Sequence, residues 1–247
     1  MKTLLKIFFT VWAAIAFMFW IVIAYVAYQL LRLFYGGKKD RQFLLFLYHF
    51  IGRMVVLFAF LRVKKVYHSS YNAKESYVVV SNHSTMMDIP ANVVASPPEI
   101  VFKFLGKKEA NRIPFFGYLI DRLCILVDRA SEESRKSSYA RMKAEMDKSY
   151  SIILYPEGTR NRTKEPIKEF YDGAFRLAIE MQKPLVVNTL VGIKELNPPT
   201  GFFTYRPGTV ESHWDEAIIT KGMTLEDIPQ LKKRAGDIMI KRLLKHS

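Results

Sequence analysis

One apolar run of the chain ends in a histidine, and an aspartate follows it closely. In the segment VVVSNHSTMMDIP, residues 78–90, the valines give way to Asn82 and His83, and Asp88 comes five residues later. Residues five apart do not share a face of a regular helix, so His83 and Asp88 meet only if the chain turns between them. An aspartate bonded to one ring nitrogen fixes the tautomer of a histidine and leaves the other nitrogen free to accept a proton. The pair therefore predicts a general base; a histidine packed beside a helix-capping aspartate is the alternative.

A second polar motif, PEGTR at residues 156–160, follows another apolar run. It supplies the carboxylate of Glu157, a glycine at Gly158, the hydroxyl of Thr159 and the guanidinium of Arg160. Arginine suits bidentate recognition of phosphate, and a glycine-containing turn after a strand exposes backbone N–H groups to anions. Alone, this motif is also compatible with an ordinary polar turn. Both motifs occurring in this order by chance is rare, so together they predict a site that handles a phosphorylated molecule.

The elements that must position these residues are short apolar runs alternating with amphipathic ones after residue 65. The β-branched runs bounded by turn residues predict strands at 76–81, 99–105, 123–129, 150–158 and 184–192. The amphipathic stretches predict helices at 89–96, 132–149, 170–182 and from Thr224 onward. This alternation predicts an α/β fold with a mostly parallel central sheet flanked by helices. Loops that leave parallel strands open on one edge of a sheet, so we expect His83, Asp128-Arg129 and the PEGTR loop to lie together there.

Two apolar segments precede this region. Residues 7–28 carry no charge and are long enough to cross a hydrocarbon core, which takes about 20 residues. The second segment, residues 43–61, contains Arg53 near its middle, where a charge at mid-bilayer costs roughly 2.5–3.5 kcal/mol. We therefore expect the second helix to lie at the membrane interface rather than to cross the bilayer.

The charges around these two apolar segments predict how the segments are placed in a membrane. Basic residues mark the cytoplasmic side of a membrane. They flank both segments and the turn between them, at Lys2, Lys6, Arg32, Lys38, Lys39, Arg41, Arg62, Lys64 and Lys65. The pattern favours a membrane-associated two-helix hairpin, residues 1–62, that dips into one leaflet from the cytoplasmic face. A first helix that spans the bilayer is the alternative. The catalytic domain is expected to occupy residues 63–247.

The composition of the chain narrows the classes of molecule that it is expected to bind. Lys and Arg exceed Asp and Glu by 37 to 23, giving a net charge of +14, which favours anionic lipids or phosphorylated substrates. Nucleic acid is not expected, because the aromatic residues are concentrated in the hairpin. The lone Cys124 forms no internal disulfide, and the five histidines show no H-x3-H spacing, so no required metal is expected. No G-x-S-x-G motif is present, which argues against a serine lipase of the α/β-hydrolase type.

The motifs resemble those of the glycerolipid acyltransferase family, in particular the bacterial 1-acylglycerol-3-phosphate acyltransferases. Asn82-His83 and Asp88 match its N-H-x4-D block, and PEGTR matches its third block. The segments GKKEANRIPFFGYL (106–119), LVDR (126–129), FYDGAFRLA (170–178) and KPLVVNTLVG (183–192) resemble the others. The chain departs from the family at Leu123, Asp172 and Val187, which leaves the acyl specificity open.

The resemblance implies transfer of an acyl group from a thioester to the sn-2 hydroxyl of lysophosphatidic acid, making phosphatidic acid for phospholipid synthesis. The thioester, on acyl carrier protein or coenzyme A, is a co-substrate, and no cofactor is implied. His83 would be the base, oriented by Asp88. The predicted substrate-binding residues are Asn82, Lys107, Arg129, Glu157, Gly158, Thr159 and Arg160, with Glu157 holding the loop or a glycerol hydroxyl.

Two rival functions remain open from the sequence. An acyltransferase of the same kind could use another acceptor, such as glycerol 3-phosphate or a lysophospholipid with a larger headgroup. A non-catalytic membrane-binding module that recognises phosphatidic acid would need Arg160 and Lys107 but not His83.

Overall fold

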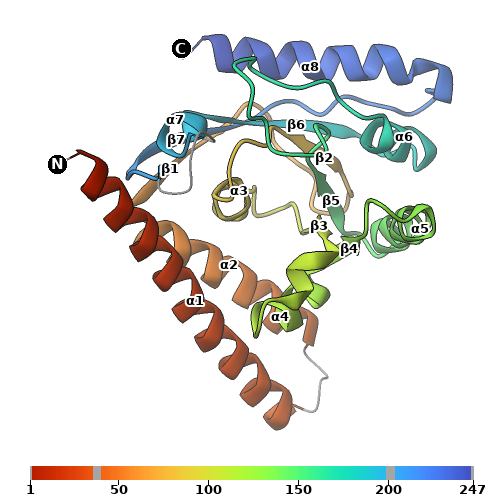
Figure 1. Ribbon diagram of the computed structural model, residues 1–247. Helices are drawn as coiled ribbons and strands as arrows, with labels where there is room; N and C mark the ends of the chain where they lie inside the picture. The colour runs from red at the N-terminus through yellow and green to blue at the C-terminus, as the bar shows by residue number, and fades with distance from the viewer. Residues whose placement is uncertain (1, 36–39, 199–203, 246–247) are drawn as a thin grey trace.

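The apolar runs after residue 60 form one seven-stranded sheet. The computed structural model describes residues 2–35, 40–198 and 204–245. The strands lie in the order β1-β7-β6-β2-β5-β3-β4 (Figure 1). Their bounds are β1 Leu61–Tyr67, β2 Val78–Ser81, β3 Phe102–Lys107, β4 Cys124–Val127, β5 Ser151–Leu154, β6 Leu185–Val191 and β7 Gly208–Trp214. Every neighbouring pair is parallel except β6 and β7, which confirms the predicted mostly parallel sheet.

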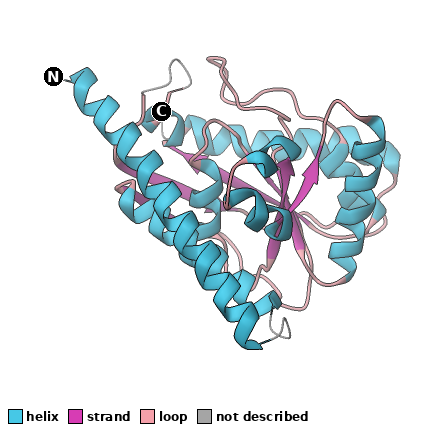
Figure 2. Cartoon of the chain, turned by 60° about the horizontal axis from the view of Figure 1, so that its bottom comes forward, coloured by secondary structure: helices cyan, strands magenta, loops and turns pink. Residues whose placement is uncertain are grey.

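Helices cover both faces of this sheet (Figure 2). Their bounds are α1 Lys2–Tyr35, α2 Asp40–Phe58, α3 Asp88–Ala95, α4 Phe116–Leu123, α5 Glu132–Asp147, α6 Gly173–Glu180, α7 Ile193–Leu196 and α8 Ile228–Leu244, with short 3₁₀ turns at Lys108–Arg112 and Leu225–Asp227. Successive residues of a strand point to opposite faces. Val78 and Val80 therefore enter the core under α5, α6 and α8, whereas Val79 enters the core on the face of α3. Burial on both faces explains why β2 reads as an unbroken valine run.

The N-terminal helices α1 and α2 lie along each other and against the sheet domain. On α2, a Cβ at Gly52 would lie 2.6 Å from Val93 Cγ1, so this glycine permits the close approach to α3. Along α1, Phe17 contacts Phe116 of α4 edge to face. The outward face of α1 exposes many large apolar side chains, including Leu4, Phe8, Ile15, Phe19, Leu33 and Phe34. By length and composition, Thr3–Tyr35 is one helix able to cross a membrane. The predicted turn cations Lys38 and Lys39 lie outside the described residues.

Four elements had no counterpart among the predicted ones: strands β1 and β7 and helices α4 and α7. Strand β1 begins at Leu61, so the sheet starts before the predicted boundary at residue 62. Both strands carry polar residues, such as Lys64 and Glu211, which form an ion pair with an Nζ–Oε1 distance of 2.7 Å across the β1–β7 pair. In β1, Leu61 and Val63 pack in the core and Arg62 faces solvent. The adjacent Lys64 and Lys65 then interrupt this alternation, so the strand lacks the continuous apolar pattern of the central strands.

Candidate active site

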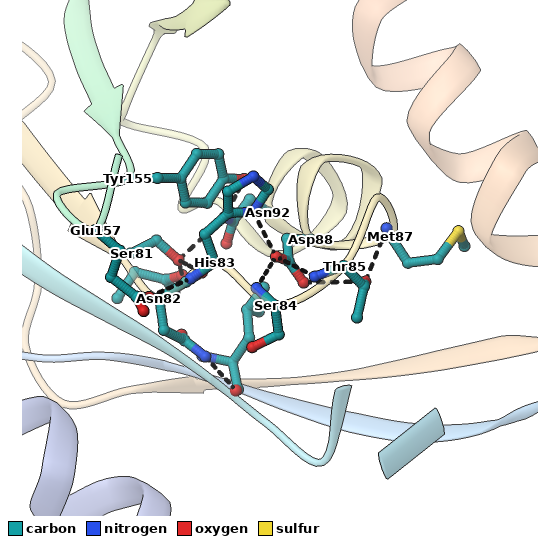
Figure 3. A network of polar contacts seen from close by, with 12 residues as sticks. Ser81, Asn82, His83, Ser84, Thr85, Met87, Asp88, Asn92, Tyr155 and Glu157 are labelled. Atoms are coloured by element: carbon teal, nitrogen blue, oxygen red, sulfur yellow. Dashed lines mark hydrogen bonds and ion pairs between the residues drawn. The ribbon is translucent and has the colours of Figure 1, made fainter. Parts of the chain in front are cut away.

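The loop after β2 brings His83 and Asp88 into contact (Figure 3). His83 Nδ1 lies 2.8 Å from Asp88 Oδ2, and the same oxygen accepts the backbone N–H groups of Ser84 and Thr85 at 2.6 and 2.9 Å. Helix α3 begins at Asp88, whose side chain is fully buried. The chain therefore turns between the two residues as the spacing required. With Asp88 Oδ2 as the acceptor, the imidazole donates from Nδ1 and keeps the lone pair of Nε2.

Glu157 ties three segments together at this site. Its Oε1 accepts the backbone N–H of His83 at 2.8 Å, and its Oε2 accepts that of Lys168 at 2.9 Å. Burial raises the pKa of the Glu157 carboxyl, and the two N–H donors oppose that rise. The neighbouring backbone N–H of Asn161 donates to the His83 carbonyl at 2.6 Å. Glu157 thus holds the loops, the first of the two roles expected for it, and it does not line the cavity beside His83.

The side chain of Asn82 is bonded to strand β6. Its amide nitrogen donates to the carbonyl of Leu190 at 3.0 Å, and its amide oxygen accepts the Leu190 N–H at 2.8 Å. The side chain is buried and does not line the cavity. The structure therefore gives Asn82 a contact with β6 that occupies both ends of its amide, and its contact with substrate stays a prediction.

A cavity of about 770 Å³ opens beside His83. One part of its wall is apolar and comes from α1, α2, α3 and α4, through residues such as Phe17, Ile51, Val55, Val93, Leu119 and Ile120. The other part carries cationic and small polar residues from the loops after β3, β4 and β5: Lys107, Arg129, Gly158, Thr159, Arg160, Arg162 and Lys168. Such a cavity fits an amphiphile with an anionic head and an apolar tail.

The PEGTR loop needs its glycine. Gly158 has φ 69°, and a Cβ there would lie 2.7 Å from Cε2 of Tyr171. Both the backbone conformation and the closeness of the Tyr171 ring disfavour a side chain at this position. The turn leaves Thr159 and Arg160 exposed at the cavity rim, where Thr159 Oγ1 accepts a bond of 2.7 Å from Lys168 Nζ.

A family model described as acyltransferase matches residues 62–190, which is more than half of the chain. The chain belongs to the acyltransferase family. The matched segment contains the His83–Asp88 pair, the loop cations up to Lys168 and the whole PEGTR loop.

Relatives of this acyltransferase carry consistent names. It is 29% identical over 167 residues to a putative 1-acyl-sn-glycerol-3-phosphate acyltransferase of Caenorhabditis elegans, covering 66% of this chain and 57% of that protein. It is 30% identical over 125 residues to a 1-acyl-sn-glycerol-3-phosphate acyltransferase of Helicobacter pylori, covering 49% and 52%. The matches thus span little more than half the length of these two relatives. The crystal structure of the 1-acyl-sn-glycerophosphate acyltransferase PlsC from Thermotoga maritima has the same fold, with a TM-score of 0.78, 22% identity and coverage of 99% of this chain and 97% of that one.

Three cavity residues of the acyltransferase were missed by the sequence reasoning. Arg162 and Lys168 add two cations to the rim, and the ring of Tyr155 stacks on His83 with centroids 4.2 Å apart. Arg162 and Tyr155 flank the PEGTR motif in the sequence, and this proximity is the signal that could have found them. Lys168 carries no such signal, because the bond from its backbone N–H to Glu157 depends on how the loop folds.

The thiol of Cys124 and the residue types that bind metal ions also bear on the chemistry. Cys124 lines the cavity, but burial raises the pKa of its thiol to about 12, so the thiol stays protonated and is a poor nucleophile. Among the described residues, no group of three or more His, Cys, Asp or Glu side chains is arranged to hold a metal ion.

Proposed function

We propose that this acyltransferase moves an acyl group from a thioester to the sn-2 hydroxyl of 1-acylglycerol 3-phosphate, giving phosphatidic acid for phospholipid synthesis. The observation that carries the proposal is the cavity itself. It joins a histidine oriented by a buried aspartate, a rim of cations and an apolar wall. The names of the relatives in worm and bacterium support the same acceptor.

The proton path follows from the geometry of the pair. An alcohol is a poor nucleophile at neutral pH and needs a base within hydrogen-bond reach. Nε2 of His83 takes the proton of the sn-2 hydroxyl as its oxygen attacks the thioester carbonyl. When the tetrahedral intermediate collapses, the C–S bond breaks and the thiolate leaves with the proton from Nε2. Asp88 stabilises the imidazolium between these steps through Nδ1. The thioester is the co-substrate, and no step needs a cofactor.

The cations would hold the glycerol phosphate. A phosphate monoester is a dianion, and charge-assisted bonds from Arg and Lys are the strong ones for such a group. Arg160 is the first candidate, with Lys107 and Arg129 as predicted partners and with Arg162 and Lys168 as additional ones. The apolar wall built by α1 to α4 would take an acyl chain.

The contacts of α1 favour attachment to one leaflet. Near its start, Thr10 Oγ1 accepts the backbone N–H of Tyr205 at 3.3 Å; near its end, Arg32 Nη1 donates to Tyr118 Oη at 2.8 Å. These contacts lie about 33 Å apart at 1.5 Å per residue, which is close to the thickness of a hydrocarbon core. A helix that touches its own domain at both places lies beside that domain. We therefore place the protein at the cytoplasmic face of the cell membrane, held by a monotopic hairpin.

An assay of acceptor and donor tests the function. Purified protein in detergent receives lysophosphatidic acid with acyl carrier protein thioester or acyl-coenzyme A, and the product is followed by mass. The expected result is phosphatidic acid with at least one donor, abolished in His83→Ala. Product from glycerol 3-phosphate or a larger lysophospholipid, but not from lysophosphatidic acid, would reassign the acceptor. If the protein binds phosphatidic acid without turnover, and His83→Ala binds it equally well, the protein is a binding module and not an enzyme.

A further inference from the structure

A chain of buried polar side chains leads through the core to the aromatic ring that faces His83. Trp214 Nε1 donates to Ser212 Oγ at 3.1 Å, and Asn188 Nδ2 donates to the same oxygen at 2.8 Å. Ser81 Oγ donates to Asn188 Oδ1 at 3.0 Å. These bonds connect β7, β6 and β2 in the middle of the sheet, where all four side chains are fully buried.

Asn92 of α3 carries this chain to the active site (Figure 3). Its amide nitrogen donates to Ser81 Oγ at 3.2 Å and to Tyr155 Oη at 3.2 Å. Tyr155 directly follows β5, and its ring lies on that of His83 with an interplanar angle of 20°. The ring of Phe104 also packs on Tyr155, with centroids 6.0 Å apart and planes 10° apart. The ring is thus held by a hydrogen bond at its hydroxyl and by packing against two other rings.

Stability does not account for these polar residues. A buried amide or hydroxyl is costly unless it is hydrogen-bonded, and apolar residues of the same shape hold a core about as well. What the hydrogen bonds between its members add is a fixed arrangement of the network, in which the buried Asn92 Oδ1 has no hydrogen-bond partner among the described residues. The member that it fixes at its outer end is the ring against His83.

We propose that Tyr155 is a positioning residue for His83, held in register by the amide of Asn92. The inference rests on the proposed function, because it assigns a task to His83 as the base. Asp88 fixes one edge of the imidazole, and the stacked ring fixes its plane, so Nε2 points at a defined place in the cavity. When His83 takes up a proton, the face of the tyrosine also stabilises the imidazolium by cation–π attraction. Burial raises the pKa of the Tyr155 hydroxyl well above its usual range, with the Asp88 charge adding to the rise, so Tyr155 does not itself act as a base.

Matched substitutions separate the stack from the hydrogen bond. Tyr155→Leu removes the ring and should lower kcat about 10- to 30-fold, while the KM for lysophosphatidic acid stays within about twofold. Tyr155→Phe keeps the ring and should restore kcat to within about threefold of wild type. Asn92→Ala removes the same hydrogen bond as Tyr155→Phe and should lower kcat by a similar factor, about threefold, at constant KM. Ser96→Ala, which removes a buried hydroxyl just after the end of the same helix, should leave kcat unchanged. If Tyr155→Leu does not fold, the comparison of Asn92→Ala with Ser96→Ala tests the proposal instead. Equal kcat values in these two variants would overturn it.

A measurement independent of turnover keeps this inference distinct from the proposed function. The ring protons of His83, assigned by their loss in His83→Gln, should resonate upfield because of the ring current of Tyr155. They should move downfield in Tyr155→Leu and stay near the wild-type shift in Tyr155→Phe. The positioning role would be overturned, and the proposed function left standing, by unchanged His83 shifts in Tyr155→Leu. A wild-type kcat in Tyr155→Leu, while His83→Ala is inactive, would have the same meaning. Full activity of His83→Ala would overturn both.

Discussion

At the scale of single residues, the site depends on a carboxylate that has no freedom to move. Asp88 accepts bonds from His83, Ser84 and Thr85, and its side chain has no contact with solvent. An asparagine in its place would keep the shape but would turn an N–H donor toward some of these donors. The carboxylate also balances the charge that His83 gains when it accepts a proton.

Asp88→Asn should therefore lower kcat by about 10²- to 10⁴-fold, with a smaller change in the KM for lysophosphatidic acid. Steady-state kinetics of the purified protein checks this. Asp172→Asn is the matched control, since that carboxylate is exposed and bonds Lys232 on the surface. An Asp88→Asn enzyme that is folded and fully active would show that His83 needs no orienting partner.

Arg160 carries the second prediction at this scale. It lines the cavity in the PEGTR loop, whereas Lys164 is an exposed cation of the same segment that does not line it. A charge-assisted bond to phosphate is worth about 1.5–3 kcal/mol, so Arg160→Ala should raise the KM for lysophosphatidic acid about 10- to 150-fold. The KM for the acyl donor should change little, and Lys164→Ala should change neither. Equal rises for both substrates in Arg160→Ala would indicate that the arginine shapes the loop.

The predictable residues of the site are those whose partners are close in sequence. His83 and Asp88 are five residues apart, so a single turn of the chain decides their contact, and the motif shows both partners. Lys168 and Tyr155 depend on contacts that only the folded sheet creates. The same holds for the bonds of the Asn82 amide, both ends of which pair with the backbone of Leu190, more than a hundred residues away.

At the scale of elements, the strands from β6 to β4 were predictable, whereas β1 and β7 at the other end of the sheet were not. The strands β2, β5 and β6 are buried on both faces, so most of their residues are apolar and many are β-branched. Strand β1 is an edge strand whose Arg62 and Lys64 face solvent. Charged side chains on an edge strand discourage pairing with other molecules, and they also erase the apolar signal from which a strand is predicted.

The loops between these elements are joined by Glu157, and this makes their stability depend on pH. Burial raises the pKa of this carboxyl above its ordinary value of 4.5. The folded state then binds the proton more tightly than the unfolded chain, so this contribution to stability is fully present below pH 4.5. It is lost as pH rises through the raised value.

Wild type and Glu157→Gln should therefore differ in how their free energies of unfolding change with pH. Urea denaturation between pH 4.5 and about 7 isolates the difference, because all other titrating groups are shared. The stability of wild type relative to Glu157→Gln should fall as pH rises and then level off. A difference that grows with pH would mean that the two N–H bonds to Glu157 outweigh its burial.

At the scale of the whole molecule, helix α1 lies between the cavity and an exposed apolar surface. The helix exposes large apolar side chains on one side and forms part of the cavity wall on the other, through Phe17 and Ile21. In the proposed function, a helix with both tasks would hold the cavity close to the lipid that contains the substrate. Its contacts with Tyr205 at one end and Tyr118 at the other fix it along the domain.

Cysteine labelling tests whether α1 keeps that position in a membrane. In a Cys124→Ala background, Thr3→Cys marks the start of α1, and Lys136→Cys marks exposed α5 on the catalytic side. If α1 lies in one leaflet, a membrane-impermeant thiol reagent should label neither variant in intact cells and both in broken cells. Labelling of Thr3→Cys in intact cells, with Lys136→Cys protected, would show that α1 spans the bilayer. The bond between Thr10 and Tyr205 could then not exist in the membrane, since Tyr205 belongs to the domain on the other side.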